Sequence, residues 1–244
     1  MFYFLLAPIM TYNLILIAAA VIPAVILMIR VYRSDKLDKE SPQLLRQLVI
    51  AGILASLLAM VEERLLSWLL SAMIGTGTVL YNVILYFGIV AFAEESSKYL
   101  LLKRRSWNSS EFDCRFDGVV YAVFVSLGFA LWENISYVML YGFSTALVRA
   151  VTAIPGHACF GVFMGIFYAL AKESELAGDG ARSKLYRFLS VLVPALLHGA
   201  YDYIASLEIV GSGWYFVIFI AVLFAVSFVL ISRASKDDHY MPRS

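Results

Sequence analysis

Long apolar runs separated by short polar connectors make up most of this 244-residue chain. A helix needs roughly 20 mainly apolar residues to cross the ~30 Å hydrocarbon core of a bilayer, and several runs reach that length. No internal repeat is evident along the chain. The pattern predicts an all-α bundle of about seven transmembrane helices. The expected spans are about 12–31, 43–72, 79–102, 118–142, 150–171, 187–207 and 213–232.

Composition supports the same class. Hydrophobic residues make up 61% of the chain and charged residues only 15%, whereas soluble domains contain nearly half apolar and about a quarter charged residues. Two cysteines, Cys114 and Cys159, provide neither a disulfide framework nor a CxxC metal motif. The first apolar run lacks a basic leader, so we expect it to stay as a helix. We expect one transmembrane domain over residues 1–244 and no nucleic-acid partner.

The basic residues predict an orientation. All Lys and Arg residues except Arg64, Lys98 and Arg149 lie in or beside the first, third and fifth connectors, or in the C-terminal tail. Cytoplasmic loops of membrane proteins carry the excess of Lys and Arg. The distribution therefore predicts an N-terminus outside and a C-terminus in the cytoplasm.

Ionisable side chains inside the expected spans need an explanation, because each costs at least a few kcal/mol in the membrane unless it is compensated. With a helical rise of ~1.5 Å per residue, five of them from four spans lie roughly 13–24 Å from the cytoplasmic face. We therefore expect them to share one layer of the membrane. These five are Glu94, Glu133, His157, His198 and Asp202.

Spacing within the helices pairs some of these groups. Glu94 and Lys98 are four residues apart, and so are His198 and Asp202, so each pair shares a helix face. We expect Lys98 to neutralise part of the acidic charge and Asp202 to orient the His198 ring. Glycines one and two turns after His157 should let a neighbouring helix approach closely.

Structural explanations exist for individual groups. An ion pair would explain Lys98 with one acid, but Glu94 and Glu95 lie side by side. The histidine–aspartate pair, or Glu133 with Asn134, would also serve as hydrogen bonds between helices. The Glu-Glu-Arg run at 62–64 is best interpreted as an interfacial charge cluster. Their joint occurrence favours a functional site, because each buried charge costs separately.

Two kinds of hydrolytic chemistry fit this set. A carboxylate can take a proton from water while a histidine or asparagine stabilises an oxyanion. Alternatively, His157, His198 and Glu133 could bind a catalytic zinc ion, with another glutamate as the base. No GxSxG motif is present, and Cys159 does not share a helical face with His157. A proton-coupled transporter or a seven-helix receptor is the alternative function, although transporters usually carry inverted repeats.

Four segments resemble one known family. They are FAEESSKYLLL at 92–102, FDGVVYAVFVSLGFALWENISY at 116–137, PGHACFGVFMG at 155–165 and LLHGAYD at 196–202. In this order, on four successive helices, they resemble the motifs of the PrsW family of intramembrane proteases. That family is distantly akin to the CAAX prenyl endopeptidase group, which shares a Glu-Glu motif and two histidine motifs. The similarity extends over about residues 92–203.

The resemblance implies site-specific cleavage of a membrane-anchored protein, in some members an anti-sigma factor in stress signalling, in the bacterial cell membrane. The family is commonly described as metalloproteases, whereas the CAAX group suggests a metal-free glutamate mechanism. Both remain open here, with zinc as the candidate metal. The resemblance implies catalytic or site-lining roles for Glu94, Glu95, His157, His198, Asp202, Glu133 and Asn134, and supporting roles for Lys98, Asp117 and Tyr137.

Overall fold

The computed structural model describes residues 2–208 and 211–242, with side chains described from residue 13 onwards. Residues 209–210 of the expected sixth connector, and the basic tail residue Arg243, lie outside the described residues. Within them the chain is helical, and the only pairing of extended backbone is an isolated bridge between Cys114 and Tyr240. The elements are α1 (Phe2–Ser34), α2 (Pro42–Met73), α3 (Val79–Val83), the π-helix η1 (Ile84–Val90), α4 (Ala91–Ser106), α5 (Asp117–Tyr141), α6 (Phe143–Val151), α7 (Ala153–Leu176), α8 (Gly180–Ala205) and α9 (Ser212–Lys236).

Seven helical segments in the described residues are long and apolar enough to cross a membrane, which confirms the predicted all-α fold and its number of spans. The third segment is composite, because α3, η1 and α4 follow one another without a loop. The fifth runs from Phe143 to Leu176 and joins α6 to α7. The expected connector at 143–149 is therefore helical, and the chain deviates from helical geometry only at Thr152.

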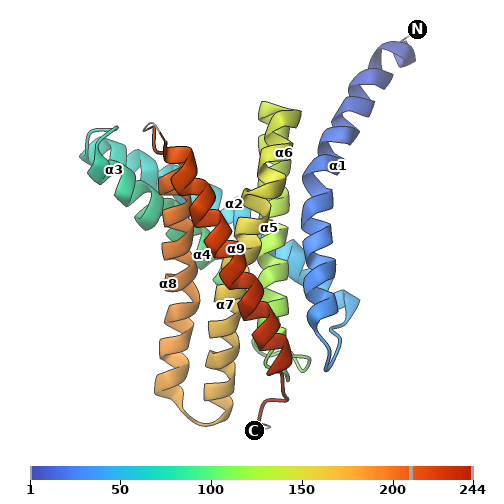
Figure 1. The fold of residues 1–244 in the computed structure, drawn as a ribbon, viewed down its shortest axis with the longest axis vertical. Coiled ribbons are helices and arrows are strands. Elements are labelled where there is room, and N and C mark those ends of the chain that lie inside the picture. Colours follow the sequence, from blue (N-terminus) through green and yellow to red (C-terminus); the bar gives the residue numbers. More distant parts are fainter. Residues whose placement is uncertain (1, 209–210, 243–244) are drawn as a thin grey trace.

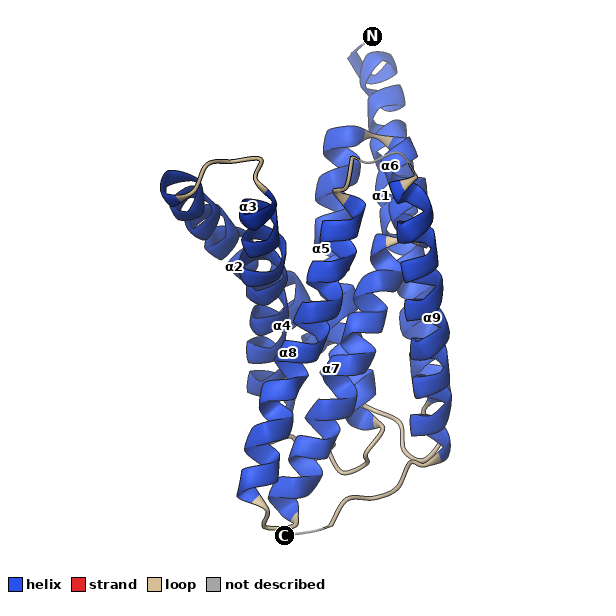
Figure 2. Cartoon of the chain, turned by 60° about the vertical axis from the view of Figure 1, so that its left-hand side comes forward, coloured by secondary structure: helices blue, strands red, loops and turns tan. Residues whose placement is uncertain are grey.

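Helix α5 forms the centre of the bundle, and most of its side chains up to Ala130 are buried. It packs against α7, α2 and α1, while α8 and α9 pack on the outer side of α7. In Figure 1 the C-terminus lies at the lower end and the N-terminus at the upper end. Figure 2 shows α2 and α3 leaning away from α5 and α6 towards that upper end.

Glycines set the crossings of the central helices. A Cβ atom on Gly52 of α2 would lie 2.1 Å from the carbonyl oxygen of Val125 in α5. A Cβ atom on Gly165 of α7 would lie 2.5 Å from the carbonyl oxygen of Gly118. Small residues permit this close backbone approach between membrane helices. The glycines that follow His157 therefore allow the close helix approach expected from the sequence, and the neighbour is α5.

Candidate active site

The ammonium of Lys98 lies at the centre of a buried polar cluster. Its Nζ is 2.7 Å from Glu95 Oε1, 3.1 Å from Glu94 Oε2 and 3.1 Å from His157 Nδ1. The Lys98 side chain is completely buried and also lies 4.0 Å from the centre of the Phe129 ring. One lysine therefore contacts two adjacent acids of its own helix and a histidine of a second helix. Its single positive charge balances only one of the two carboxylates, so an ion pair alone does not account for both.

The hydrogen bonds of His157 fix its tautomer. An ammonium can only donate, so His157 Nδ1 accepts from Lys98. Its Nε2 is 2.9 Å from Glu133 Oε2 and therefore carries the proton and donates to that carboxylate. His157 is thus a neutral imidazole bridging Lys98 of α4 and Glu133 of α5.

His198 has an acidic group at each ring nitrogen. Its Nδ1 donates to Glu95 Oε1 at 2.9 Å, and its Nε2 lies 3.5 Å from Asp202 Oδ2. The ring stacks on Phe160 of α7, with the ring centres 4.6 Å apart. The structure thus places Asp202 beside His198, as the four-residue spacing predicts. However, the shorter contact of His198 is with Glu95.

Two further polar residues, Arg149 and Asn134, lie at the edge of this cluster. Arg149 Nη2 donates to Glu133 Oε2 at 2.8 Å, and Arg149 Nε donates to Asn134 Oδ1 at 2.9 Å. The other end of the Asn134 amide donates to the carbonyl oxygen of Ala20 in α1. Asn134 is fully buried and lines neither cavity beside the cluster. The expectation that Asn134 lines the site is therefore corrected, because its amide joins α5 to α1.

Two adjacent cavities open beside the cluster, with volumes of about 270 and 250 Å³. One lies against α2 and α5, and the other lies among α4, α5, α7 and α8. Four residues line both of them: Glu63, Glu94, Glu133 and Tyr137. His157, His198 and Asp202 line only the second. Glu94 is thus the member of the Glu-Glu pair that faces open space.

Glu63 and Arg149 were not among the site residues that sequence reasoning identified. Their signals were visible, since both are charged residues near apolar spans. However, the sequence pattern places Glu63 in an interfacial cluster and Arg149 in a connector. Glu63 of α2 lines both cavities, and the helical continuation through α6 holds Arg149 over Glu133.

Local backbone features position the catalytic candidates. The π-helix η1 ends at Val90, one turn before Glu94, and π-helical turns occur frequently at functional sites. On α8, a Cβ atom at Gly199 would lie 2.6 Å from the Phe87 ring of η1. The absence of a side chain there lets α8 approach η1 closely, which brings the neighbouring His198 to the Glu-Glu pair.

The two remaining supporting residues differ in position. Tyr137 lines both cavities, and its ring lies 4.1 Å from the guanidinium carbon of Arg149. Asp117 instead accepts the backbone N–H groups of Asp113 and Cys114 at the start of α5. It is sixteen residues from Glu133, which is roughly 24 Å along the helix. The expected support of the site by Asp117 is therefore corrected to a cap at the far end of α5.

The donor set fits a divalent metal in type and spacing. One ligand atom from each of Glu94, Glu95, His157 and His198 lies within 4.8 Å of the others. Zinc binds such imidazole and carboxylate donors. This group differs from the expected ligand set, because Glu133 contacts the outer nitrogen of His157 instead of joining it. Since Lys98 already contacts three of the four residues, a metal at their centre would replace its ammonium as the countercharge.

Formal charge also leaves room for a cation. In the cluster and its cavities, the described carboxylates exceed the Lys and Arg side chains by two. Uncompensated charge at membrane depth must be neutralised by protons or by a bound cation. The carboxylates counted are Glu63, Glu94, Glu95, Glu133 and Asp202, and the cations are Arg64, Lys98 and Arg149.

Comparison with known proteins identifies one family. The family model described as PrsW family intramembrane metalloprotease matches residues 40–231. Protease PrsW of Bacillus subtilis (strain 168) is 34% identical over 191 residues, which cover 78% of this chain and 83% of that protein. Protease PrsW of Halalkalibacterium halodurans is 30% identical over 223 residues, covering 91% and 98%. No solved structure shows significant similarity to the chain.

These matches extend well beyond the motif-bearing segments and include α2, which contributes Glu63. The matches favour a peptidase over the transporter and receptor alternatives. Together with seven membrane-spanning helices, they make the chain an integral multi-pass bacterial membrane protein. The buried cluster of glutamates and histidines, and the similarity over most of the chain, show that this protein belongs to the PrsW family of intramembrane metalloproteases.

Proposed function

We propose that the protein hydrolyses a peptide bond of a membrane-tethered protein and that Glu94 is the general base. The observation that carries this proposal is the different setting of the two adjacent glutamates. Glu95 is completely buried and bonded to Lys98 and His198, whereas Glu94 faces both cavities. Only a carboxylate that reaches open space can take a proton from an attacking water.

In the proposed reaction, water bound in the shared part of the two cavities loses a proton to Glu94 and attacks the carbonyl carbon. The protonated Glu94 then donates that proton to the leaving amine nitrogen. One peptide bond and one water become a carboxylic acid and an amine, and because Glu94 has passed on its proton, it ends the cycle ionised. Because Lys98 contacts Glu94 at 3.1 Å, its ammonium stabilises the ionised form between turnovers.

Glu95 and Glu133 act as positioning residues in this proposal. Glu95 holds Lys98 on one side and His198 on the other. Glu133 accepts from His157 Nε2 and so fixes the orientation of that ring. Both contacts keep the cluster rigid, which supports catalysis because the reacting groups need little reorganisation.

Donors on the wall of the second cavity would stabilise the oxyanion. His198 lies between Glu95 and Asp202, and as an imidazolium it would carry a proton on Nε2 as well as on Nδ1. Its Nε2 is 3.5 Å from Asp202, so this N–H would be available to a substrate oxygen. Arg149 lines the same cavity and carries a permanent positive charge. We assign the oxyanion to the space between these two residues.

Zinc is the metal that the donor types favour, and Glu95, His157 and His198 are the residues that would hold it, which leaves Glu94 free to act as the base. When bound, zinc would supply Lewis-acid activation of water at neutral pH. Metal analysis of the purified protein tests this part of the proposal. Stoichiometric zinc that is lost in His157→Ala would support it, whereas full cleavage by protein stripped of metal would overturn it and leave Glu94 as the base.

The substrate class follows from where the cavities lie. Their lining residues belong to membrane-spanning helices, so a substrate reaches Glu94 from within the bilayer. We propose a membrane-anchored protein as substrate, with anti-sigma factors as the class that the family resemblance suggests. A membrane anchor would hold a single segment of such a protein at the depth of Glu94.

We further propose that the N-terminus is outside and the C-terminus is cytoplasmic. The warrant is the concentration of Lys and Arg in the odd-numbered connectors and the tail. A reporter that works only in the cytoplasm should be active when it is fused to the C-terminus. Activity of a reporter that requires the outside would contradict the proposed orientation.

Comparison of membrane proteomes tests the proposed function. Cells that express the wild-type chain or the Glu94→Gln variant at equal level are compared by sequencing new protein N-termini. In cells that express the wild type, we expect new N-termini within or next to the spans of a small number of membrane-anchored proteins. These termini should be missing from cells that express Glu94→Gln. Identical sets of termini from the two strains would contradict the proposal.

A further inference from the structure

A large cavity in the described residues lies on the opposite side of α7 from the catalytic candidates. Its volume is about 590 Å³, and it is bounded by α1, α7 and α9. It shares no lining residue with the two cavities beside Glu94. Cavities of this size commonly hold small-molecule ligands. The site is therefore separate from the catalytic cluster and is independent of the proposed function.

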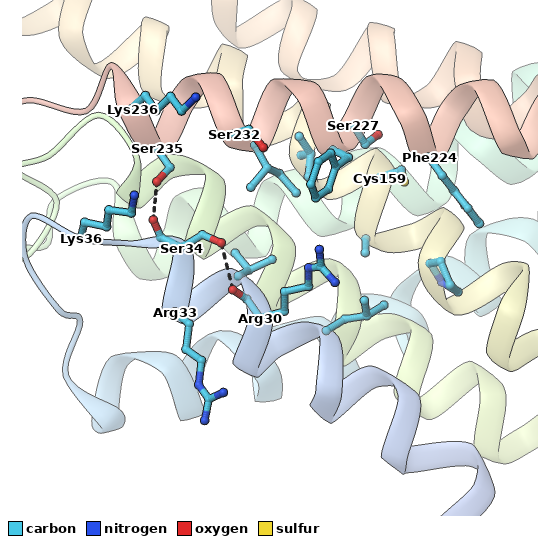
Figure 3. Close-up of a pocket in the computed structure, with 17 residues that line it drawn as sticks. Arg30, Arg33, Ser34, Lys36, Cys159, Phe224, Ser227, Ser232, Ser235 and Lys236 are labelled. Carbon is cyan, nitrogen blue, oxygen red and sulfur yellow. Dashed lines mark hydrogen bonds between the residues drawn. The ribbon is translucent and has the colours of Figure 1, made fainter.

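One end of this cavity is basic and the rest is apolar. Figure 3 shows Lys36 and Lys236 together at one end, and Cys159 and Phe224 towards the other. Arg30 and Arg33 also lie at the basic end, where α1 and α9 finish, although Arg33 points away from α9. Its walls are mainly aliphatic and aromatic side chains.

The basic side chains at this end lack ion-pair partners. None of the four basic side chains forms an ion pair within the described residues, and no carboxylate lines the cavity. The two helix C-termini contribute roughly half a negative charge each. Arg30, Lys36 and Lys236 therefore outnumber the helix-end charge inside the cavity, and the neighbouring carboxylates Asp35 and Asp237 do not line it, so an anion is favoured here.

Side chains already present suit the polar part of a lipid. The hydroxyls of Ser34, Ser232 and Ser235 lie among the basic groups, and Ser235 donates to the Ser34 carbonyl across the gap between α9 and α1. Arg30 lies across the same gap, with its guanidinium carbon 5.5 Å from the centre of the Phe228 ring. These groups would hold a phosphate and hydroxyls at the membrane surface.

We propose that this cavity binds an anionic phospholipid, with its phosphate among Arg30, Lys36 and Lys236 and one acyl chain along α7 towards Cys159. The excess of basic residues on one side of a membrane protein explains the charges in general. It does not explain their convergence on an apolar cavity. Basic pockets between membrane helices bind acidic headgroups. The bound lipid would join α1 to α9 and so stabilise the edge of the bundle.

Native mass spectrometry of the full chain in detergent tests the proposal with two lipids of equal chain length. We expect dioleoylphosphatidylglycerol to bind at least about tenfold more tightly than dioleoylphosphatidylcholine, since each nearby Lys or Arg contributes about 1 kcal/mol to anionic lipid attraction. The double variant Arg30→Gln, Lys236→Gln should lose this preference. The matched control Arg182→Gln, Lys184→Gln removes two charges from the α7–α8 end of the molecule and should keep it.

Labelling of the two cysteines with N-ethylmaleimide locates the bound lipid without any variant. Cys159 lines the cavity and Cys114 does not, so phosphatidylglycerol should slow labelling of Cys159 alone. Equal binding of both lipids to the wild type, or an unchanged preference in the double variant, would overturn the proposal. Protection of Cys159 that rises with protein concentration in the absence of lipid would also overturn it, because a second copy would then cover the cavity.

Discussion

Removal of the Lys98 ammonium should destabilise the protein more than most single substitutions. Lys98→Met keeps the length and apolar stem of the side chain but leaves Glu94 and Glu95 without their shared countercharge. The Lys98 side chain is 0% exposed, and those of Glu94 and Glu95 are 7% and 0% exposed. Glu95 lines neither cavity beside the cluster, so water cannot replace its lost contact.

The expected magnitude follows from this burial. Removing one partner of a buried ion pair typically costs ~3–5 kcal/mol, because the remaining charge is uncompensated. An exposed pair contributes only ~0–1 kcal/mol, and Arg182 with Asp179 is such a pair, with side chains 64% and 44% exposed. Arg182→Met is therefore the matched control and should change the free energy of unfolding by less than about 1 kcal/mol.

Reversible unfolding in mixed micelles, followed by circular dichroism, measures both variants. A second substitution distinguishes charge from packing. Adding Glu95→Gln to Lys98→Met removes a carboxylate that Lys98 compensated, so stability should recover with a coupling energy of ~1–3 kcal/mol. If Lys98→Met unfolds with the wild-type free energy, or if the Glu95 substitution adds a further loss, the assignment of Lys98 as the shared countercharge is wrong.

Three further results are expected. Glu133→Gln should lower the cleavage rate by roughly 10–100-fold, because it weakens the contact that orients His157; wild-type turnover would contradict the positioning role. Gly199→Ala should destabilise the protein by ~1–3 kcal/mol and reduce activity, because its Cβ would lie 2.6 Å from the Phe87 ring of η1. Gly213→Ala serves as the control, because a Cβ there meets nothing within 4 Å. Burial raises the pKa of Glu40, which lies outside the spans, from 4.5 to about 7, so its contribution to stability falls as pH rises from 4.5 through 7. Glu40→Gln should therefore unfold at a higher denaturant concentration than the wild type at pH 8 but not at pH 4. An equal difference at both pH values would contradict this.

The sequence predicts the seven spans and the convergence of Glu94 with His157 and His198, because both signals are local. Apolar runs of sufficient length define the spans, and charges inside them are conspicuous. Four-residue spacing also predicts the contacts of Lys98 with Glu94 and of Asp202 with His198. Helical rise alone places these groups in one layer of the membrane.

Rotation and tilt of the helices are not local properties, and the corrections arise there. Glu63 lines both cavities because α2, which approaches α5 closely at Gly52, presents that side chain to the same space as Glu94 and Glu133. Asn134, next to Glu133, faces α1 because adjacent residues on a helix point in different directions. Arg149 reaches Glu133 because an expected connector is helical.

The central claim is that Glu94 takes the proton from the attacking water. It is tested most directly by the single-turnover cleavage rate of purified wild-type and Glu94→Gln protein, reconstituted with a substrate identified from its new N-termini. The substitution keeps the size of the side chain, and the account predicts a rate at least ~10²-fold lower with unchanged unfolding. A Glu94→Gln protein that cleaves within twofold of the wild-type rate would contradict it.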